Sequence, residues 1–306
     1  MTRTFPLDDY DLAATLDSGQ VFRWSARGDG WEGVLGSQWF RLRQTERRLH
    51  VETATHPESW EPLLHFLGMD QNLAGILSTF PNDPPMREAV AACPGLRLLR
   101  QDPWECVASF ILSSTKQIVQ IRQCVRLLCE RFGLPVPVPP GTPAAFSFPT
   151  AARLAQVGEP ELRECKLGFR ARYLDSTARL IAQGDPVLQE VADLPTAEGR
   201  SRLMDLPGVG RKVADCVLLF AYGRQDAFPV DVWVQRALRQ LYFPNRRPNP
   251  RMLERFASTH FGPFAGYAQQ YLFHYVRTRL GRSGFPGDPG SRRSSRVQSR
   301  GSRSSP

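Results

Sequence analysis

The pattern of apolar and polar residues changes character near residue 57. Before that point, short aromatic and β-branched runs are separated by Gly, Asp and Ser, and QWFRLRQT shows the clearest alternation. Such runs are typical of strands in a twisted antiparallel sheet. We therefore expect a sheet over residues 7–53, built from the runs VFRW, GWEGVLG, QWFRLRQT and RLHVET.

From Pro57 onward, apolar residues recur at helical spacing. Strands that come first and helices that follow indicate an α+β fold, with a small N-terminal twisted antiparallel sheet packed on a mostly α-helical body. One long amphipathic run, at about 103–132, predicts a single helix, and the Pro-rich stretch 134–143 predicts a loop. The other predicted helices lie in ESWEPLLHFLGMD, NLAGILSTF and MREAVAAC, and at about 149–157, 159–165, 171–184, 231–241, 250–260 and 264–280.

Three parts are expected along the chain. Residues 1–95 form the N-terminal antiparallel β-sheet domain with the helices that follow it, and residues 96–280 form the helical body. Residues 281–306 hold six Arg and one Asp, so this tail contributes +5 of the formal net charge of +9. Its Ser, Gly, Pro and Arg composition predicts a disordered segment. The tail either adds unspecific attraction to phosphates or has no specific role.

Composition narrows the class of protein. The 306 residues are 42% hydrophobic, with no apolar run near the roughly 20 residues that a membrane helix needs, so we expect a cytoplasmic protein without membrane contact. Six scattered cysteines show neither CxxC pairs nor an iron–sulfur spacing, which predicts reduced thiols, no metal site and no cofactor. A pI of about 9.6 favours a polyanionic partner.

The segment MDLPGVGRKVADCVLLF predicts a helix, a tight turn at Gly208 to Gly210, and a second helix from near Arg211. This is a helix-hairpin-helix. Glycine at both positions lets the backbone take positive φ and approach another molecule closely. The amides that begin the second helix have no partner within it and provide a site for a phosphate.

Lys212 and Asp231 are the residues of this region with the strongest chemistry. Of the 39 basic residues only Lys116, Lys166 and Lys212 are lysine, and a lysine amine can act as a nucleophile whereas arginine cannot. Lys212 falls in a first helical turn, where the helix dipole favours the neutral amine. Asp231 precedes a helical run and is a predicted N-cap. A phosphate contact for Lys212 and a purely structural cap for Asp231 stay open.

A lysine in such a hairpin, followed about twenty residues later by an aspartate, resembles the helix-hairpin-helix DNA glycosylase superfamily. Within it, the chain is most similar to the 8-oxoguanine DNA glycosylase/AP lyases. The matching segments spread from about residue 10 to 280 and are LDSGQVFRW, GWEGVLGSQWFRLRQTERRLH, QDPWECVASFILSS, KLGFRARY, LPGVGRKVADC, PVDVWV and FGPFAGYAQQYLF.

The resemblance implies a reaction on a base that is flipped out of duplex DNA. Lys212 would attack C1′, expel the oxidised base and form a Schiff base that permits β-elimination of the 3′ phosphate. Asp231 would stabilise the positive charge that develops on the sugar. Gly208 and Gly210 would hold the DNA backbone.

The resemblance also implies a base pocket. The main-chain carbonyl of Gly19 would accept the N7 proton that distinguishes 8-oxoguanine from guanine. Cys216 and Phe273 would sandwich the flipped ring, Gln269 would bind its Watson–Crick edge, and Pro229 would line the pocket. Gln269 and Phe273 are four residues apart, hence on one helix face. From residue type alone, Cys216 and Phe273 are equally consistent with core positions, and Gly19 with an ordinary turn.

Other matches concern the gap left in the DNA. Arg170 would contact the base opposite the lesion, and Phe169 would wedge into the stack where relatives often carry tyrosine. An aromatic beside an arginine is otherwise a common surface pair.

Three positions depart from the eukaryotic pattern. Thr115 and Gln120 stand in place of an asparagine and a second arginine that reads the opposite cytosine, and Trp233 replaces a histidine near the 5′ phosphate. Losing a base-reading arginine weakens discrimination by about 1–3 kcal/mol. We therefore expect a looser requirement for cytosine opposite the lesion, and an altered pocket edge at Trp233.

The sequence therefore predicts a bifunctional DNA glycosylase/AP lyase of base excision repair. Its expected partner is double-stranded DNA containing oxidised guanine, bound by a monomer. The scarcity of lysine relative to arginine fits a bacterium, where the protein would be cytoplasmic and nucleoid-associated. Two alternatives stay open, a glycosylase of the same superfamily for another damaged base, and a non-catalytic DNA-binding protein that uses the hairpin as a phosphate clamp.

Overall fold

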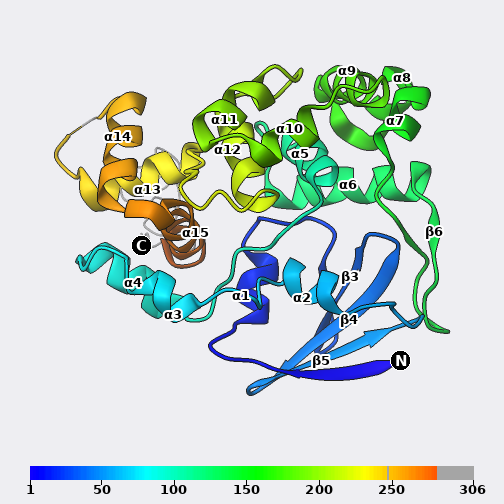
Figure 1. Cartoon of the computed structure of the whole chain (residues 1–306), viewed down its shortest axis with the longest axis horizontal. Helices are drawn as coiled ribbons and strands as arrows, with labels where there is room; N and C mark the ends of the chain where they lie inside the picture. The colour runs from blue at the N-terminus through cyan, green and yellow to red at the C-terminus, as the bar shows by residue number, and fades with distance from the viewer. Residues whose placement is uncertain (247, 281–306) are drawn as a thin grey trace, which may run out of the picture.

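The computed structural model describes residues 1–246 and 248–280, and the predicted tail at 281–306 lies outside them. A five-stranded antiparallel sheet lies beneath a larger group of helices (Figure 1). The α+β arrangement expected from the sequence is confirmed. The sheet has the order β1-β5-β4-β3-β2. Its strands are β1 Thr2–Pro6, β2 Ser25–Arg27, β3 Gly30–Leu35, β4 Gln38–Thr45 and β5 Arg48–Thr53.

Strand β4 shows why this sheet is covered on both faces. Phe40 and Leu42 are buried in the core of the N-terminal part, and β4 pairs there with β5 through Leu42 opposite Val51. Trp39 points to the other face, where it packs with Val34 and Val136. Val136 belongs to β6 (Pro135–Val136), which pairs with β7 (Ala145–Phe146). The Pro-rich stretch predicted as a loop therefore carries a two-stranded ladder that covers the sheet.

The N-terminal prediction was wrong in one respect that matters for the site. Residues 12–17 form a helix, α1 (Leu12–Asp17), and VFRW at 21–24 is not a strand. Asp11 caps α1 by accepting a hydrogen bond from the amide of Ala14. Local capping and the burial of Leu12 and Leu16 outweigh the strand-like composition of this region. Gly19 therefore lies in a turn after a helix and not within the sheet.

The predicted long helix at 103–132 is two helices, α5 (Pro103–Ile111) and α6 (Ile118–Phe132). Thr115, in the connection between them, has a φ of 57°, which lies in the left-handed region that ends a helix. The apolar period continues across the break, so periodicity alone does not reveal it. We call the connection, residues 112–117, the α5–α6 turn.

The remaining helices follow the predicted order, with bounds that differ by a few residues, and α10 was not predicted. Lys166 lies in an irregular segment with a φ of 62°. The helices are α2 Glu61–Phe66, α3 Leu73–Leu77, α4 Pro84–Ala92, α7 Ala151–Val157, α8 Glu159–Leu162, η1 Arg163–Leu167, α9 Arg170–Ala182, α10 Val187–Asp193, α11 Thr196–Met204, α12 Arg211–Phe220, α13 Val232–Tyr242, α14 Pro250–His260, η2 Gly262–Phe264, α15 Ala265–Tyr275 and η3 Val276–Leu280.

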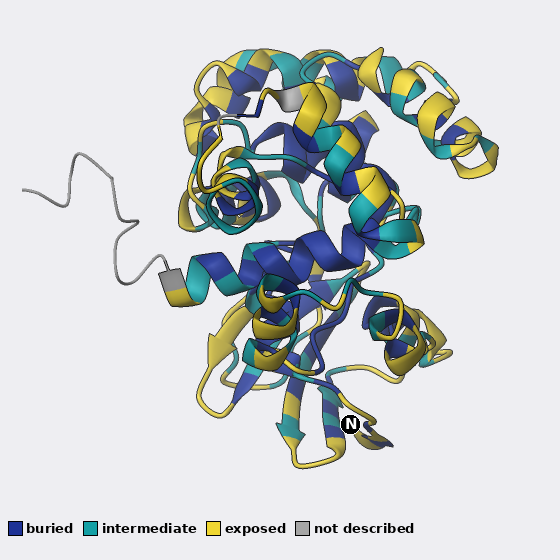
Figure 2. Cartoon of the chain, turned by 90° about the vertical axis from the view of Figure 1, so that its left-hand side faces the viewer, coloured by how far each residue is buried: buried dark blue, intermediate teal, exposed yellow. Residues whose placement is uncertain are grey.

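Helix α15 joins the two parts of the molecule. It crosses the centre as an almost wholly buried helix (Figure 2). Its tyrosines reach the chain that leads out of the N-terminal part, because the Tyr267 hydroxyl accepts the amide of Leu98 and the Tyr271 hydroxyl donates to the carbonyl of Leu96. Helices α3 and α4 contribute residues to the core of the helical body. The expected division at residues 95 and 96 stays a prediction.

Candidate active site

The predicted hairpin lies between α11 and α12, and α9 supports it from behind. The amide of Val209 donates to the carbonyl of Leu206 at 3.1 Å, which closes the turn. Thr177 of α9 donates its hydroxyl to the carbonyl of Pro207 at 2.8 Å. Gly208 has a φ of 81°, and a Cβ there would lie 2.6 Å from Cβ of Tyr173. Both observations require glycine at position 208.

Gly208 uses the positive φ that glycine allows, whereas Gly210 does not. The φ of Gly210 is −92°, which any residue can adopt. Gly210 is the N-cap of α12, no side chain caps this helix, and a Cβ at Gly210 would meet nothing within 4 Å. The first amides of α12 therefore face open space, as an anion site at a helix start requires.

Lys212 lies in the first turn of α12 and is half-buried. Its Nζ donates a hydrogen bond to Oγ of Ser113 at 3.0 Å. The same nitrogen stands 5.0 Å from the centroid of the Phe110 ring. Both partners come from the end of α5 and from the α5–α6 turn, so this region fixes where the amine lies.

Cys216 follows Lys212 by one turn of α12 and is buried. Burial raises the pKa of its thiol to about 12, the positive charge of Lys212 opposes the rise, and the negative charge of Asp231 adds to it. Lys212 and Cys216 are four residues apart on α12 and hence on one face of that helix, and the charge of Asp231 acts on the same thiol.

Asp231 is the N-cap of α13, as predicted. Its Oδ1 accepts the amide of Val234 at 2.8 Å. The backbone at Asp231 is extended, with φ of −95° and ψ of −178°, which is usual for an N-cap. The cap fixes the orientation of the carboxylate.

Two of the residues predicted for base recognition, Gly19 and Phe273, meet between the N-terminal part and α15. Gly19 has a φ of 84°, and a Cβ there would lie 2.6 Å from Cδ1 of Ile118 and 3.5 Å from Cε1 of Phe273. Gln270 donates its side-chain amide to the carbonyl of Ser18 at 3.1 Å, which ties α15 to this turn. Gly19 and Phe273 therefore lie side by side although they are distant in sequence.

Gln269 is 4% exposed, and its Oε1 has no hydrogen-bond partner within the described residues. A buried, unpaired amide oxygen is costly unless a ligand or water completes it. Pro229 is also buried, two residues before Asp231. The Phe110 ring, which lies close to the Lys212 amine, is edge-to-face with the ring of Phe22 at 5.5 Å between centroids, and Phe22 is three residues after Gly19.

Phe169 and Arg170 begin α9 but differ sharply in exposure. Phe169 is 49% exposed and follows Gly168, whose φ is 61°. Arg170 is only 6% exposed, and its Nε donates to the carbonyl of Ser114 at 2.7 Å. Arg170 also donates to the carbonyl of Leu167 and to Oγ1 of Thr115. The Arg170 guanidinium is thus hydrogen-bonded to the α5–α6 turn.

Gln120 and Trp233 lie at two helix starts. Gln120 is exposed, and its Oε1 accepts the amide of Gln117 in a reciprocal capping box that begins α6. Trp233 is 40% exposed in the first turn of α13, with the guanidinium of Arg236 at 5.8 Å from its ring centroid.

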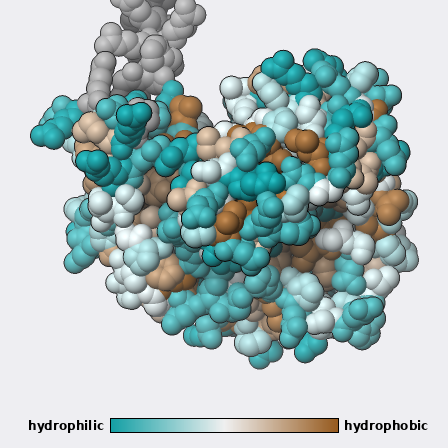
Figure 3. Space-filling model, turned by 45° about the horizontal axis from the view of Figure 1, so that its top comes forward, coloured by the Kyte–Doolittle hydropathy of each residue, from teal (hydrophilic) through white to brown (hydrophobic). Residues whose placement is uncertain are grey.

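On the face formed by α9 and α11, apolar groups stand among hydrophilic side chains (Figure 3).

Sequence reasoning missed Phe110 and Ser113 as neighbours of the lysine. The signal for Ser113 is weak, since it is one of two adjacent serines in an apolar context. Lys116 was also passed over, although its Nζ donates to the carbonyl of Lys166 at 3.1 Å and ties the α5–α6 turn to the segment before α9.

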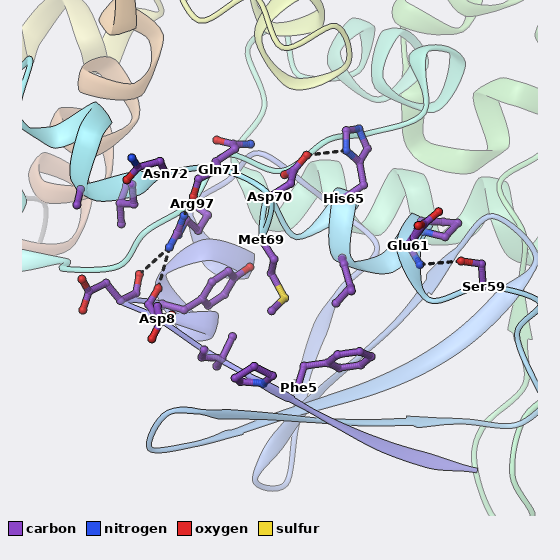
Figure 4. Close-up of a pocket in the computed structure, with 18 residues that line it drawn as sticks. Phe5, Asp8, Ser59, Glu61, His65, Met69, Asp70, Gln71, Asn72 and Arg97 are labelled. Atoms are coloured by element: carbon purple, nitrogen blue, oxygen red, sulfur yellow. Dashed lines mark hydrogen bonds and ion pairs between the residues drawn. The ribbon is translucent and has the colours of Figure 1, made fainter.

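A large cavity lies elsewhere, in the N-terminal part. It measures about 1100 Å³ and lies between β1 and the segment 59–74, with Arg97 at its inner side (Figure 4). Arg97 donates to the carbonyls of Asp8, Asp9 and Gln71, and His65 contacts Asp70. None of the predicted site residues lines this cavity.

Two absences hold within residues 1–246 and 248–280. No group of three or more His, Cys, Asp or Glu side chains is arranged to hold a metal ion. No helix there has the length and apolar character that a membrane crossing requires.

Comparison with known proteins gives two family matches that together cover most of the chain. Residues 4–107 match the N-terminal domain of 8-oxoguanine DNA glycosylase. Residues 108–263 match the HhH-GPD superfamily of base excision DNA repair proteins.

Curated relatives carry related names. The chain is 33% identical to the N-glycosylase/DNA lyase OGG1 of Arabidopsis thaliana over 294 residues, covering 88% of this chain and 79% of the relative. It is 29% identical to the N-glycosylase/DNA lyase of Saccharomyces cerevisiae over 261 residues, covering 76% and 68%.

Solved structures agree in fold. MBOgg1 in complex with low affinity DNA ligand superposes with a TM-score of 0.86 at 32% identity, covering 92% of this chain and 96% of that one. The Clostridium acetobutylicum 8-oxoguanine glycosylase/lyase, in complex with DNA containing cytosine opposite 8-oxoG, gives 0.83 at 29% identity, covering 90% and 97%.

Proposed function

The chain belongs to the HhH-GPD superfamily of base excision DNA repair proteins and carries the N-terminal domain of the 8-oxoguanine DNA glycosylases, and we propose how its residues perform that chemistry. It is an 8-oxoguanine DNA N-glycosylase and AP lyase of base excision repair, acting on DNA. The sugar carbon is inaccessible within stacked bases, so the damaged nucleotide is flipped out of the duplex before the reaction.

Lys212 is the proposed nucleophile. A bond forms between Nζ and C1′ while the bond between C1′ and the base nitrogen breaks, and the bonding electrons leave with the base, which takes up a proton. Opening of the sugar ring gives a Schiff base between lysine and C1′. Loss of a proton from C2′ then expels the 3′ phosphate and cleaves the strand. The position of Nζ, beside Ser113 and near Cys216, supports this role.

Asp231 is the proposed electrostatic partner. Its carboxylate is negative and held in place by the amide of Val234. A fixed negative charge stabilises the positive charge that develops on the sugar as the base departs. Because the cap is formed before substrate arrives, the carboxylate needs no reorganisation during the reaction.

The proposed base pocket combines three separate parts of the chain. The carbonyl of Gly19 accepts the N7 proton of 8-oxoguanine, and Cys216 and Phe273 cover the two faces of the ring. The unpaired Oε1 of Gln269 supports its assignment to the Watson–Crick edge, because a base donor would satisfy it. Pro229 lines the pocket next to Asp231.

The hairpin and the start of α9 are the proposed DNA contacts. Gly208 and Gly210 bring the first amides of α12 to a phosphate, and Phe169, half-exposed, is the wedge that fills the gap. Arg170 reaches the opposite base only after it releases the carbonyl of Ser114. Gln120, engaged in its capping box, supports the expected loose choice of opposite base. Thr115 and Trp233 keep their proposed places at the edge of this surface.

A monomer without membrane contact, located with the DNA of a bacterium, remains our expectation for the assembly and its place in the cell. A single species in sedimentation, at the monomer mass without DNA and at the mass of one protein per duplex with DNA, would support the first part.

The observation that carries the proposal is the Lys212 amine in the first turn of α12, hydrogen-bonded to Ser113 and followed one turn later by the buried Cys216, while Asp231 caps the helix α13. The test is borohydride trapping on a duplex that contains 8-oxoguanine. Wild-type protein should give a covalent complex and a cleaved strand, and Lys212→Gln should give neither, because no amine reaches C1′.

Lys166→Gln is the matched control, since Lys166 is another lysine of the chain and has no assigned role. It should trap as wild type does. Trapping by Lys212→Gln, or no trapping by wild type, would contradict the assignment.

A further inference from the structure

The Ser113 hydroxyl oxygen accepts a hydrogen bond from the Lys212 amine at 3.0 Å. The two residues are 99 positions apart in sequence, so this contact exists only in the fold. No salt bridge involving Lys212 occurs among the described residues. The serine lies in the α5–α6 turn, and resting on the proposed function, its chemistry bears directly on the nucleophile.

The hydrogen-bond direction at Ser113 follows from its two partners. Oγ of Ser113 lies 2.7 Å from the carbonyl oxygen of Phe110, and a carbonyl only accepts. The hydroxyl proton is therefore committed to Phe110, and the serine oxygen can only accept from Lys212. The chain of donors runs from lysine to serine to main chain.

This direction suits a nucleophile. A neutral lysine amine has two N–H groups and one lone pair, and attack on C1′ requires the lone pair. Because Ser113 accepts one N–H and has no proton left to donate, it restrains the nitrogen without occupying the lone pair. A serine with a free hydroxyl proton would instead bind that lone pair and weaken the nucleophile.

The restraint also has an entropic value. Lysine has four rotatable side-chain bonds, and its freedom must be lost before the amine stands at reacting distance from C1′. Nζ is held from one side by the serine oxygen and lies 5.0 Å from the ring centroid of Phe110. The Phe110 ring is itself fixed by stacking on Phe220, with 5.6 Å between centroids. Phe110 thus holds the lysine through its ring and the serine through its carbonyl.

We infer that Ser113 is a positioning residue for the Schiff-base lysine, which accepts one N–H of Lys212 and leaves the lone pair directed at the sugar. It does not touch the substrate and takes no proton in the reaction. Its effect is on the fraction of time that the amine spends in the attacking position.

The test measures single-turnover base excision from an 8-oxoguanine duplex across pH, with melting temperature and duplex affinity measured alongside. Ser113→Ala should lower the plateau rate about tenfold, through loss of one hydrogen bond and of orientation. The inflection of the pH profile, the melting temperature and the affinity should stay as in wild type. Ser113→Thr, which keeps the hydroxyl, should restore most of the rate.

Ser78→Ala is the matched control. The Ser78 hydroxyl donates to the carbonyl three residues earlier, Gly75, at 2.7 Å, as Ser113 does to Phe110, but no lysine donates to it. This variant should excise at the wild-type rate. Ser113→Cys gives a second approach, since sulfur is a weak acceptor of similar size, and it should be slow like the alanine variant.

Three results would overturn the inference. The first is a wild-type excision rate for Ser113→Ala. The second is a loss of excision rate that is accompanied by a matching loss of melting temperature or duplex affinity. The third is a shift in the inflection of the pH profile with an unchanged plateau rate. Failure of the proposed function is distinguishable, because wild-type protein itself would then neither excise the base nor trap on the duplex.

Discussion

Two helices begin at the active site, and their first turns are built in opposite ways. Helix α13 is closed by a side chain, because the carboxylate of Asp231 accepts the amide of Val234. Helix α12 begins at Gly210 with no side-chain cap and with open space beside it. A capped start fixes a charge for chemistry, whereas an uncapped start keeps its amides available to an outside anion. On the proposed function, the missing cap of α12 is a functional feature, because it leaves the amides beside Lys212 available to a phosphate.

Removing the negative charge of Asp231 while keeping its helix cap should give the largest effect, a loss of excision rate. Asp231→Asn keeps an oxygen that accepts the amide of Val234 but removes the negative charge, so we expect excision to fall about 10²–10³-fold with little change in melting temperature. Asp231→Ala removes both and should in addition cost about 1 kcal/mol of unfolding free energy. Single-turnover rates and thermal melts measure the two effects. Equal excision rates for Asp231→Asn and wild type would mean that Asp231 acts only as the N-cap of α13.

Closing the open start of α12 should have an intermediate effect. In Gly210→Asp the new carboxylate would cap the helix and repel a phosphate, and the φ of −92° accepts it without strain. We expect duplex affinity to weaken roughly tenfold while unfolding free energy rises by a few tenths of a kcal/mol. Fluorescence anisotropy with undamaged duplex measures the affinity. Gly210→Asn would cap the helix without adding a charge, so it distinguishes repulsion of the phosphate from occupation of the amides. Unchanged duplex affinity in both Gly210→Asp and Gly210→Asn would show that the hairpin amides do not bind DNA.

A change at the start of α6 should give the smallest effect, a modest shift in opposite-base preference. Gln120 closes α6 through the amide of Gln117, and Gln120→Arg would exchange this cap for a base-reading side chain. We expect preference for cytosine over adenine opposite the lesion to rise about fivefold, the lower end of a base contact at about 1 kcal/mol. Excision from duplexes with each of the four opposite bases measures it. In wild type, strict dependence on cytosine would contradict the loose choice that we expect.

The sequence predicted the parts of this site that depend on local chemistry. Gly208, Lys212 and Asp231 lie in one short stretch, where turn, helix start and cap each follow from neighbouring residues. The α+β order follows from the change of period near residue 57, in the same way. These features need no knowledge of distant contacts.

Other features depend on contacts that periodicity does not encode. The break between α5 and α6 interrupts a continuing apolar pattern, because Thr115 takes a left-handed conformation there. Helix α1 was missed because Asp11 and two buried leucines outweigh composition. Arg170 was expected at the DNA, yet its guanidinium donates to the carbonyl of Ser114, 56 residues earlier, which no local rule anticipates.

The α5–α6 turn touches two functions with neighbouring residues. Ser113 holds the amine of Lys212, while the carbonyl of Ser114 and the hydroxyl of Thr115 hold Arg170. We therefore expect a substitution that reshapes this turn to displace the proposed nucleophile and Arg170 together. Catalytic rate and choice of opposite base are therefore coupled through this turn. Relatives whose turn differs so that one of these properties changes should differ in the other as well.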